Sequence, residues 1–335
     1  MTKIAINGFG RIGRQTFKRI LETHPDLEVV AINDLTDTKT LAHLLKYDSS
    51  YGILNKEVSF DERNIIVDSK KYKVLAEKNP ENLPWKDLEV DIVLECTGLF
   101  NDKESAQKHI TAGAKKVILS GPAKEKEVPG FILGVNSDEF DISKTDIMDM
   151  GSCTTNCLAP VAKILNDNFK IVKGFMTTVH SYTNDQRILD LPHKDLRRAR
   201  AAAVNMIPSS TGAAKAIGKM IPDLQGKLDG ISIRVPTAAV SVLDLTVEVE
   251  NATDKESVNN AFKKAEKQES LEGIFRVETN ELVSSDFKGD SYSSIIDESQ
   301  TMVNGNMVKV LAWYDNEWGF SCRLAQFAEF VGKKL

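Results

Sequence analysis

The sequence predicts an α/β protein in which a doubly wound parallel sheet is followed by an α+β domain with a largely antiparallel sheet. Strand-like and helix-like segments alternate from residue 3 to about residue 150, which is typical of a parallel sheet covered by helices. Beyond that point, long runs alternate apolar and polar residues, as strands with one buried face do. The 335 residues are enough for about two domains.

The amino-acid composition argues against several classes of function. The net charge of −5 does not favour a nucleic-acid partner. No apolar run reaches the ~18 residues of a membrane span, and the first residues do not resemble a signal peptide. Four cysteines are too few for a disulfide framework. We therefore expect a cytoplasmic protein with no membrane or nucleic-acid partner.

The first turn of the chain has a dinucleotide-binding pattern. The apolar strand 3–7 is followed by Gly8, Gly10 and Gly13 in the spacing G-x-G-x-x-G, and then by a helical pattern. The first glycine makes the tight turn, the second lets the backbone approach a pyrophosphate, and the third permits close helix–strand packing. The alternative is a glycine-rich turn without a ligand.

Asp34 ends the next strand, 27–34, and stands 21 residues after Gly13. A carboxylate there can bind both hydroxyls of an adenosine ribose and would repel a 2′-phosphate. The pattern therefore predicts NAD, rather than NADP, in a Rossmann domain.

Further elements complete the first domain. Thr97 and Gly98 fall at the carboxyl edge of the sheet, where open α/β sheets bind ligands. Cys96 is interpreted as a small core residue. The expected elements are a helix at 40–47, short antiparallel strands within 56–77, strands at 91–98, 116–120, 131–135 and 146–150, and a helix through 106–110.

The second half has longer strands. Asn304 and Gly305 predict a hairpin between the segments 301–303 and 307–313. We expect strands at 171–181, 230–235 and 240–249, helices at 212–221 and 256–268, and a final helix at 323–331 that packs back on the first domain.

Cys153 is a candidate nucleophile because it begins a helix directly after a strand. Free N–H groups and the positive end of the helix dipole favour a thiolate there. Ser152 and Thr154 beside it are suited to capping or to holding a small anion. Cys157 lies one helical turn further on, but no second Cys/His pair stands at ligand spacing, so no metal site is predicted.

His180 ends the strand 171–181 and is the candidate base for Cys153. A thiol, a histidine and an NAD site together fit covalent aldehyde oxidation. Thiolate addition creates a tetrahedral carbon that can release hydride, and the resulting thioester can pass its acyl group to a second nucleophile. A histidine packed for structural reasons is the alternative.

Several groups suggest that this second nucleophile is an anion. Thr154, Thr211 and Gly212 offer hydroxyl and backbone donors, and Arg198 and Arg234 offer guanidinium groups that match phosphate oxygens. For Arg234 the alternative is a salt bridge to a carboxylate. For the basic segment that contains Arg198, it is a solvated surface.

Five motifs together resemble the phosphorylating, glycolytic glyceraldehyde-3-phosphate dehydrogenase family. They are Asn7–Gly13, Ser152–Pro160, Thr178–Thr183, His193–Arg200 and Trp313–Glu317, in the family's order. The resemblance runs from residue 3 to beyond residue 320. It implies oxidation of D-glyceraldehyde 3-phosphate to 1,3-bisphosphoglycerate with NAD and inorganic phosphate, with Cys153 as nucleophile and His180 as base.

The resemblance also implies the other site residues. NAD would be contacted by Arg11, Ile12, Asp34, Lys78, Ser120 and Asn316, in addition to the three glycines. Thr183 and Arg234 would hold the phosphate of the substrate. The inorganic phosphate would be held or neighboured by Ser152, Thr154, Arg198, Thr211 and Gly212.

The implied organisation is a homotetramer. Each chain would have an NAD-binding domain at 1–152, a catalytic domain at 153–316, and a C-terminal helix at about 317–335 against the first domain. The segment around 181–205 would reach toward a neighbouring subunit's cofactor.

The sequence departs from the family pattern at a few positions. Met150 and Gly151 replace Asn-Ala, Phe320 stands where many members have Tyr, and Lys78 replaces a frequent Arg. Two other functions stay open. One is an erythrose-4-phosphate dehydrogenase, and the other is an NAD-binding protein whose Cys153 is a redox switch.

Overall fold

The computed structural model describes residues 1–335, which form two compact units. The first unit contains Met1–Phe131, Glu139–Gly151 and Ser321–Leu335. The second contains Ile132–Asp138 and Ser152–Phe320. None of the helices combines the length and the apolar character that crossing a membrane requires.

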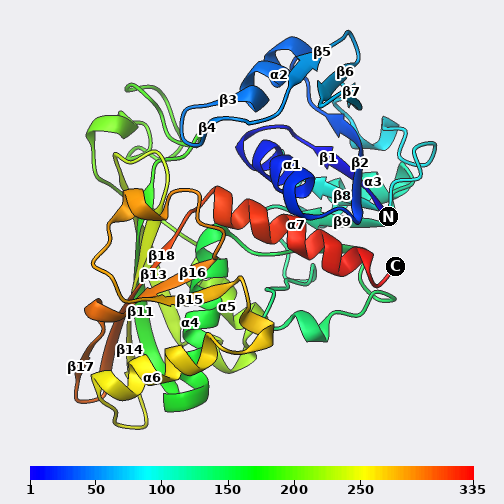
Figure 1. The fold of residues 1–335 in the computed structure, drawn as a ribbon. Helices are drawn as coiled ribbons and strands as arrows, with labels where there is room; N and C mark the ends of the chain where they lie inside the picture. Colours follow the sequence, from blue (N-terminus) through cyan, green and yellow to red (C-terminus); the bar gives the residue numbers. More distant parts are fainter. The chain divides into compact units, whose positions relative to one another are not determined.

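The first unit is built on an eight-stranded sheet with the order β10-β9-β8-β1-β2-β7-β6-β5 (Figure 1). The strands from β10 to β7 pair in parallel, and β7, β6 and β5 pair antiparallel. Its strands are β1 (Thr2–Asn7), β2 (Leu27–Asn33), β5 (Val58–Phe60), β6 (Asn64–Val67), β7 (Lys70–Leu75), β8 (Ile92–Glu95), β9 (Lys116–Leu119) and β10 (Ile147–Asp149). A small hairpin joins β3 (Tyr47–Asp48) to β4 (Gly52–Ile53), and the helices are α1 (Arg11–Thr23), α2 (Thr38–Lys46) and α3 (Lys103–Thr111).

The turn between β1 and α1 requires its glycines. Gly8 has φ +91°, a conformation that residues with a side chain rarely adopt. A Cβ on Gly13 would lie 2.1 Å from the carbonyl oxygen of Gly8, so a side chain cannot fit there. A Cβ on Gly10 would meet nothing within 4 Å. The first and third glycines therefore shape the turn, and the second leaves its surface open.

The second unit contains a largely antiparallel sheet with the order β12-β13-β11-β14-β18-β16-β15, with β17 paired to β18. Its strands are β11 (Ile171–Ser181), β12 (Ile207–Ser210), β13 (Leu228–Val235), β14 (Ser241–Val249), β15 (Phe275–Glu278), β16 (Ser294–Asp297), β17 (Met302–Asn304) and β18 (Met307–Tyr314). Its helices are α4 (Cys153–Phe169), α5 (Ala213–Met220) and α6 (Lys255–Ala265).

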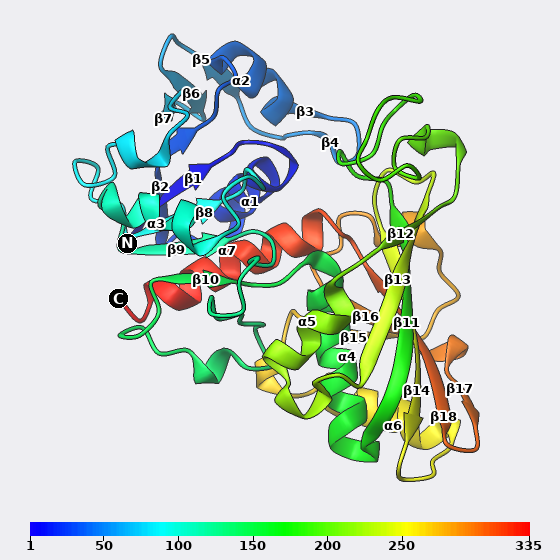
Figure 2. The same cartoon turned by 180° about the vertical axis from the view of Figure 1, so that it is seen from behind.

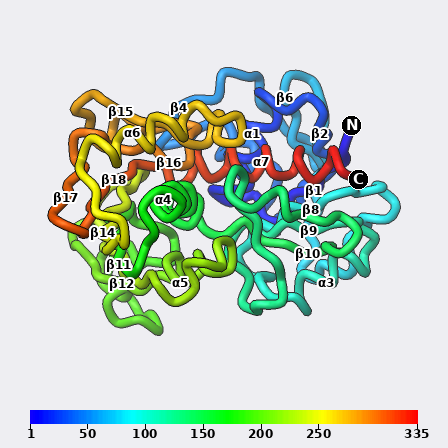
Figure 3. Tube along the Cα trace, turned by 90° about the horizontal axis from the view of Figure 1, so that it is seen from below, coloured from blue at the N-terminus to red at the C-terminus, as the bar shows by residue number.

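The helices α4, α5 and α6 lie on one side of this sheet (Figures 2 and 3). The alternate residues of β14 that face them are buried, including Leu243, Leu245 and Val247. No α-helix lies on the opposite side of the sheet (Figure 2). The last helix, α7 (Trp318–Gly332), begins in the second unit, and from Ser321 onward it clusters with the first. Short 3-10 helices occur at Pro80–Asn82, Ser137–Glu139, Ala202–Val204, Pro222–Leu224, Glu269–Leu271, Ser284–Phe287 and Glu298–Gln300.

The predicted fold class is confirmed, but some individual elements were wrong. The apolar segment 131–135 is not a strand. Gly134 has φ +75°, and a Cβ there would lie 2.5 Å from the carbonyl oxygen of Ser270, so the chain turns while Ile132 and Leu133 remain buried. Because the segment is buried without pairing to a neighbouring strand, its apolar pattern is the same as that of a buried strand.

Other differences concern sheet pairing. The segment 56–77 is antiparallel as expected, but β7 also pairs in parallel with β2, so the segment extends the main sheet. The prediction missed the short strands β12, β15 and β16. Two of them, β12 and β15, are at the edges of the sheet and have only four residues each.

Candidate active site

The N-terminus of α4 holds the candidate nucleophile. Ser152 is the N-cap, and its Oγ accepts a hydrogen bond from the Thr155 amide at 3.1 Å. Thr155 Oγ1 in turn accepts the Ser152 amide at 3.2 Å, which completes a capping box. Cys153 is the first residue of the helix and is half-buried. The position of its thiol is therefore fixed by a rigid helix end.

Cys153 and His180 are brought together. The Sγ atom of Cys153 lies 3.4 Å from Nε2 of His180, although 27 residues separate them. His180 is buried on β11, and its Nδ1 lies 2.7 Å from the carbonyl oxygen of Ser181. A carbonyl can only accept, so Nδ1 carries the proton and donates it. The Nε2 lone pair then faces the thiol and can take its proton.

Arg234 lies directly beside this pair because β11 and β13 run parallel with His180 opposite Arg234. Its Nη1 donates to Thr183 Oγ1 at 3.0 Å and to Ser181 O at 3.3 Å, and lies 3.1 Å from His180 Nδ1. The buried Nε of Arg234 has no partner. The alternative of a salt bridge is not realised for Arg234, since none of these partners is a carboxylate.

The surroundings keep both members of the pair neutral. Burial, and to a lesser extent the Arg234 charge, lower the pKa of His180 to about 3. Burial raises the pKa of Cys153, whereas the Arg234 charge and the Thr154 hydroxyl act in the opposite direction. His180 is therefore uncharged at neutral pH and is available as a base.

Tyr314, on β18, is a site residue that sequence reasoning missed. Its buried hydroxyl lies 2.9 Å from Thr154 Oγ1 and 2.7 Å from Thr178 Oγ1, and its ring packs edge-on against His180. Burial raises the pKa of Tyr314 well above its usual value, so the phenol stays protonated. The alternation of buried residues along β18 was the available signal, because it directs Tyr314 inward.

A second chain of hydrogen bonds fixes Asn316. The Ser181 amide donates to Ser241 Oγ at 3.1 Å, and Ser241 Oγ donates to the Asn316 side-chain carbonyl at 3.1 Å. The bonded Oδ1 sets the orientation of the Asn316 amide group. Ser241 had not been identified from the sequence.

Arg198 and Thr183 are also close together, linked by Asp185. Arg198 Nη1 donates to Asp185 Oδ2 at 2.7 Å, and the Thr183 hydroxyl donates to the other oxygen of the same carboxylate. Arg198 Nη2 also reaches the Ser210 carbonyl at 3.2 Å, immediately before Thr211. The predicted anion groups thus form one connected cluster, from Arg234 through Thr183 to Arg198.

Thr211 and Gly212 form the turn that precedes α5. The Ala213 amide donates to Thr211 Oγ1 at 3.2 Å, and Gly212 is the N-cap residue, with no side-chain cap. The start of this helix is therefore a turn with backbone donors in the same part of the second unit as Arg198.

The predicted nucleotide residues of the first unit lie at the carboxyl ends of its parallel strands. Asp34 follows β2. Its carboxylate accepts hydrogen bonds from the backbone amides of Phe9, at 2.8 Å, and Thr36, at 2.9 Å. Ser120 follows β9 and is half-buried. The hydrogen bond from the Phe9 amide ties Asp34 to the turn between β1 and α1, called the glycine turn below.

Arg11, Ile12 and Lys78 differ in exposure. Ile12 is half-buried in the first turn of α1, and Lys78 is exposed beyond β7. Arg11 donates to both oxygens of Asp48, at 2.7 and 3.2 Å. Burial opposes the charge on Asp48, yet these bonds and backbone amides lower its pKa to about 2.

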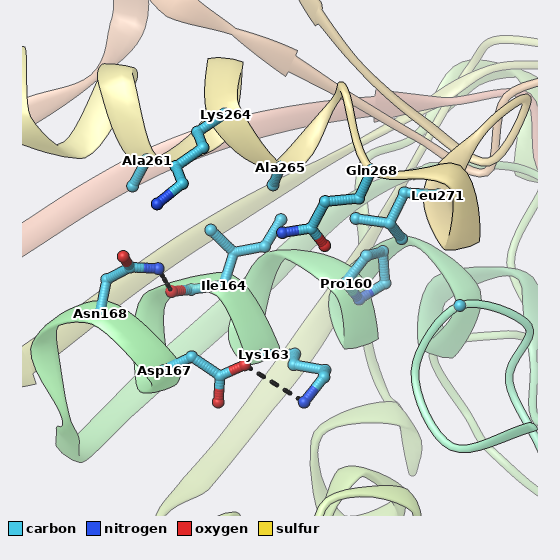
Figure 4. A pocket seen from close by; sticks show the side chains of 11 residues that line it. Pro160, Lys163, Ile164, Asp167, Asn168, Ala261, Lys264, Ala265, Gln268 and Leu271 are labelled. Atoms are coloured by element: carbon cyan, nitrogen blue, oxygen red, sulfur yellow. Dashed lines mark hydrogen bonds and ion pairs between the residues drawn. The ribbon is translucent and has the colours of Figure 1, made fainter. Parts of the chain in front are cut away.

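A separate pocket of about 130 Å³ lies between α4 and α6 (Figure 4). Lys163 and Asp167, which form an ion pair at 3.2 Å, line one side of it, and Lys264 and Gln268 line the other. The pocket includes none of the predicted site residues. The structure has no group of three or more His, Cys, Asp or Glu side chains that could hold a metal ion.

A doubly wound unit with a dinucleotide turn and a unit with a thiol–imidazole pair define an NAD-dependent oxidoreductase, and comparison with known proteins agrees. The NAD-binding domain model of glyceraldehyde 3-phosphate dehydrogenase matches residues 2–103, and the model of its C-terminal domain matches residues 152–316. The chain belongs to the glyceraldehyde 3-phosphate dehydrogenase family. The predictions of NAD as cofactor and of a dehydrogenase are confirmed.

Curated relatives are similar along their entire length. A glyceraldehyde-3-phosphate dehydrogenase of Streptomyces coelicolor is 55% identical over 334 residues, which cover 99% of both chains. The Bacillus cereus protein named glyceraldehyde-3-phosphate dehydrogenase 1 is 55% identical, covering 100% of this chain and 99% of its own. The Geobacillus stearothermophilus enzyme is also 55% identical, covering 99% and 98%.

Proposed function

We propose that this protein oxidises D-glyceraldehyde 3-phosphate to 1,3-bisphosphoglycerate in glycolysis, using NAD and inorganic phosphate. The observation that supports this most directly is the Cys153–His180 pair, with Sγ 3.4 Å from Nε2 at the start of α4. A neutral imidazole beside a thiol is the arrangement that general-base activation needs.

The reaction begins when His180 Nε2 takes the thiol proton and Cys153 Sγ bonds to the aldehyde carbon. The protonated His180 then donates to the aldehyde oxygen, which gives a hemithioacetal. In the oxidation step His180 takes the hydroxyl proton as the C–O double bond forms and the hydride leaves. Bound NAD would supply the acceptor for that hydride and its electron pair. The enzyme is left as a Cys153 thioester.

Phosphate then releases the product. A phosphate oxygen attacks the thioester carbon, the carbon–sulfur bond breaks, and the Cys153 thiolate recovers a proton from His180. Tyr314 stabilises this geometry, because its hydroxyl connects Thr154 on the nucleophile helix to Thr178 on the strand of His180. No side chain of the protein other than Cys153 needs to form a covalent bond with the substrate.

The anion sites are assigned from the cluster of arginines. Arg234 and Thr183 would bind the substrate's phosphate, and the unpartnered Nε of Arg234 supports this role. The attacking phosphate would be bound or neighboured by Ser152, Thr154, Arg198, Thr211 and Gly212. Asp185 binds both Arg198 and Thr183, so an anion would compete with its carboxylate.

The cofactor would be bound through the residues of the glycine turn and the strand ends. Asp34 supports the choice of NAD over NADP, since a 2′-phosphate would meet its carboxylate. The assigned contacts are Gly8, Gly10, Arg11, Ile12, Gly13, Asp34, Lys78, Ser120 and Asn316. Residues 1–152 would be the NAD-binding domain, with the helix at about 317–335 against it, and residues 153–316 the catalytic domain.

The protein would function as a homotetramer in the cytoplasm, where a nucleophilic thiol stays reduced. The uncovered side of the second unit's sheet supports an interface, since Phe175 there is 75% exposed and Ile231 lies on the same face. The segment 186–206 also exposes large apolar side chains: Ile188, Leu189, Leu191, Leu196, Val204 and Met206.

The test is NADH formation by the purified protein with glyceraldehyde 3-phosphate and NAD, with and without inorganic phosphate. Sustained turnover that depends on phosphate is expected. A single burst of about one NADH per site, stalling even with phosphate, would contradict phosphorolysis. A higher kcat/KM for erythrose 4-phosphate in the same assay would show that the substrate assignment is wrong.

A further inference from the structure

A buried network of polar side chains crosses the sheet of the first unit, and the chemistry described above does not use it. Its centre is Glu95, the last residue of β8, together with His109 of α3. Both side chains are fully buried. A buried carboxylate is costly unless its oxygens are satisfied, so its partners indicate what the network holds in place.

Glu95 accepts four hydrogen bonds. Trp85 Nε1 donates to Nδ1 of His109 at 2.9 Å, so Nδ1 is the acceptor and the ring proton lies on Nε2. That proton is donated to Glu95 Oε2 at 3.1 Å, and Asn7 Nδ2 donates to the same oxygen at 2.5 Å. The amide of Thr97, at 2.8 Å, and its hydroxyl both donate to Oε1.

The network continues across the neighbouring strands. Asn33 Nδ2 donates to Asn7 Oδ1 at 2.7 Å and to the Glu77 carbonyl at 2.9 Å. The Glu77 amide donates back to Asn33 Oδ1 at 2.9 Å. In the sheet order β8-β1-β2-β7, these contacts join the carboxyl ends of four adjacent strands, where Asn7 forms the last strand pairs with Asn33 and with Glu95.

Each of these strand ends leads directly into a segment at the edge of the sheet that is proposed to bind NAD, called the nucleotide edge here. Asn7 precedes the glycine turn, Asn33 precedes Asp34, and Glu77 precedes Lys78. Thr97 begins the turn that contains Gly98, which has φ +72°. A Cβ on Gly8 would lie 2.7 Å from the Thr97 nitrogen, so the glycine turn and the Thr97 turn are packed in contact.

We propose that Glu95 is a positioning residue that fixes the relative positions of the strand ends at the nucleotide edge. His109 orients its carboxylate, and Asn7 and Asn33 continue the hydrogen-bonded network to the neighbouring strands. Glu95 touches no reacting atom. It fixes the four strand ends so that their backbone groups meet the cofactor together, and binding then requires little further ordering. The inference rests on the nucleotide edge assigned in the proposed function.

The decisive variant is Glu95→Gln, which keeps the shape of the side chain. All four partners of Glu95 are donors, so an amide nitrogen must face at least one of them, and the network cannot be satisfied. NAD binding is measured by calorimetry on the full-length protein without aldehyde or phosphate. Its outcome is therefore independent of whether the proposed oxidation occurs. We expect the Kd for NAD to rise by at least about tenfold.

Two further variants serve as a control and as an independent test. Glu62→Gln, at an exposed position of the same unit, should leave the Kd unchanged. Asn33→Ala breaks the link from Asn7 to Glu77 but leaves all the donors of Glu95 in place, and should also weaken NAD binding. It serves in place of Glu95→Gln if that variant does not fold.

Kinetics separate positioning from a purely structural role. Positioning predicts a raised KM for NAD, with kcat at saturating NAD within about twofold of the parent. A lowered melting temperature together with an unchanged Kd for NAD, in both Glu95→Gln and Asn33→Ala, would overturn the proposal and leave the network as core structure.

Discussion

At the scale of single residues, one imidazole determines what the site can do. Ser181 fixes the ring of His180 through Nδ1, and the Arg234 charge lies on that same side, 3.1 Å from Nδ1. The ring is therefore held neutral, with Nε2 directed at the thiol. The candidate base was identifiable from the sequence as a histidine at a strand end, but its tautomer depends on a contact with the neighbouring residue, Ser181.

Replacing His180 with Asn removes the proposed base and leaves the proposed nucleophile, Cys153, in place. The oxidation rate should fall by about 10²- to 10⁴-fold, the usual contribution of general-base catalysis. The pre-steady-state rate of NADH formation measures this, and the NAD affinity should not change. His43→Asn, at an exposed position of α2, is the matched control. Equal rates in the His180 variant and the parent would exclude the assigned role.

Asp34 should determine the choice of cofactor. In Asp34→Gly the carboxylate that would repel a 2′-phosphate is gone, so the ratio of kcat/KM for NADP to that for NAD should increase by at least about tenfold. Some loss of activity with NAD is also expected, because Asp34 holds the Phe9 amide at 2.8 Å. An unchanged ratio would show that selectivity lies elsewhere.

At the scale of elements, strand register brings together residues that are distant in the sequence. The parallel pairing of β11 with β13 places His180 opposite Arg234, and β12, antiparallel to β13, carries Ser209 and Ser210 to Arg198. The sequence indicated each strand end or basic residue separately. It could not predict which residues would face each other, because register is set by long-range packing.

The elements also show why some predictions were right. The strand–turn–helix at residues 3–21 was predictable because its glycines are required by local backbone geometry, as Gly8 at φ +91° illustrates. The segment 131–135 was misassigned because its burial comes from a turn against a distant backbone. Tyr314 was overlooked because its role depends on Thr154 and Thr178, which lie 160 and 136 residues away in the chain.

The glycine turn allows a test that separates folding from binding. Gly13→Ala places a Cβ 2.1 Å from the Gly8 carbonyl oxygen and should lower the free energy of unfolding by about 1–3 kcal/mol. Gly10→Ala meets no atom within 4 Å, so it should stay within about 0.5 kcal/mol of the parent and yet weaken NAD binding. Thermal unfolding and calorimetry measure the two effects. Equal losses of stability would contradict this division.

At the scale of the whole molecule, each compact unit has its own task in the proposed reaction. The pair Cys153–His180 and the two arginines all belong to the second unit, and the glycine turn and Asp34 belong to the first. Apolar side chains that neither unit buries, such as Phe175, are expected to be covered in the proposed tetramer.

The assembly can be tested by charging that face. Phe175→Glu places a carboxylate on the uncovered sheet and should shift the protein from tetramer to smaller species, because an unpaired charge is costly to bury in an interface. Light scattering coupled to size-exclusion chromatography measures the mass. Ile53→Glu, at an exposed position of the first unit, should leave the tetramer intact. A monomeric parent protein would contradict the proposed oligomer itself.

In the proposed reaction, Cys153 carries the acyl group between oxidation and phosphorolysis. The most direct measurement is mass spectrometry of the intact protein and of the peptide that contains Cys153, after mixing with glyceraldehyde 3-phosphate and NAD without phosphate. We predict a phosphoglyceroyl adduct on Cys153 that disappears when inorganic phosphate is added and does not form in Cys153→Ser. NADH formation with no adduct, or an adduct that phosphate does not remove, would contradict this role of Cys153.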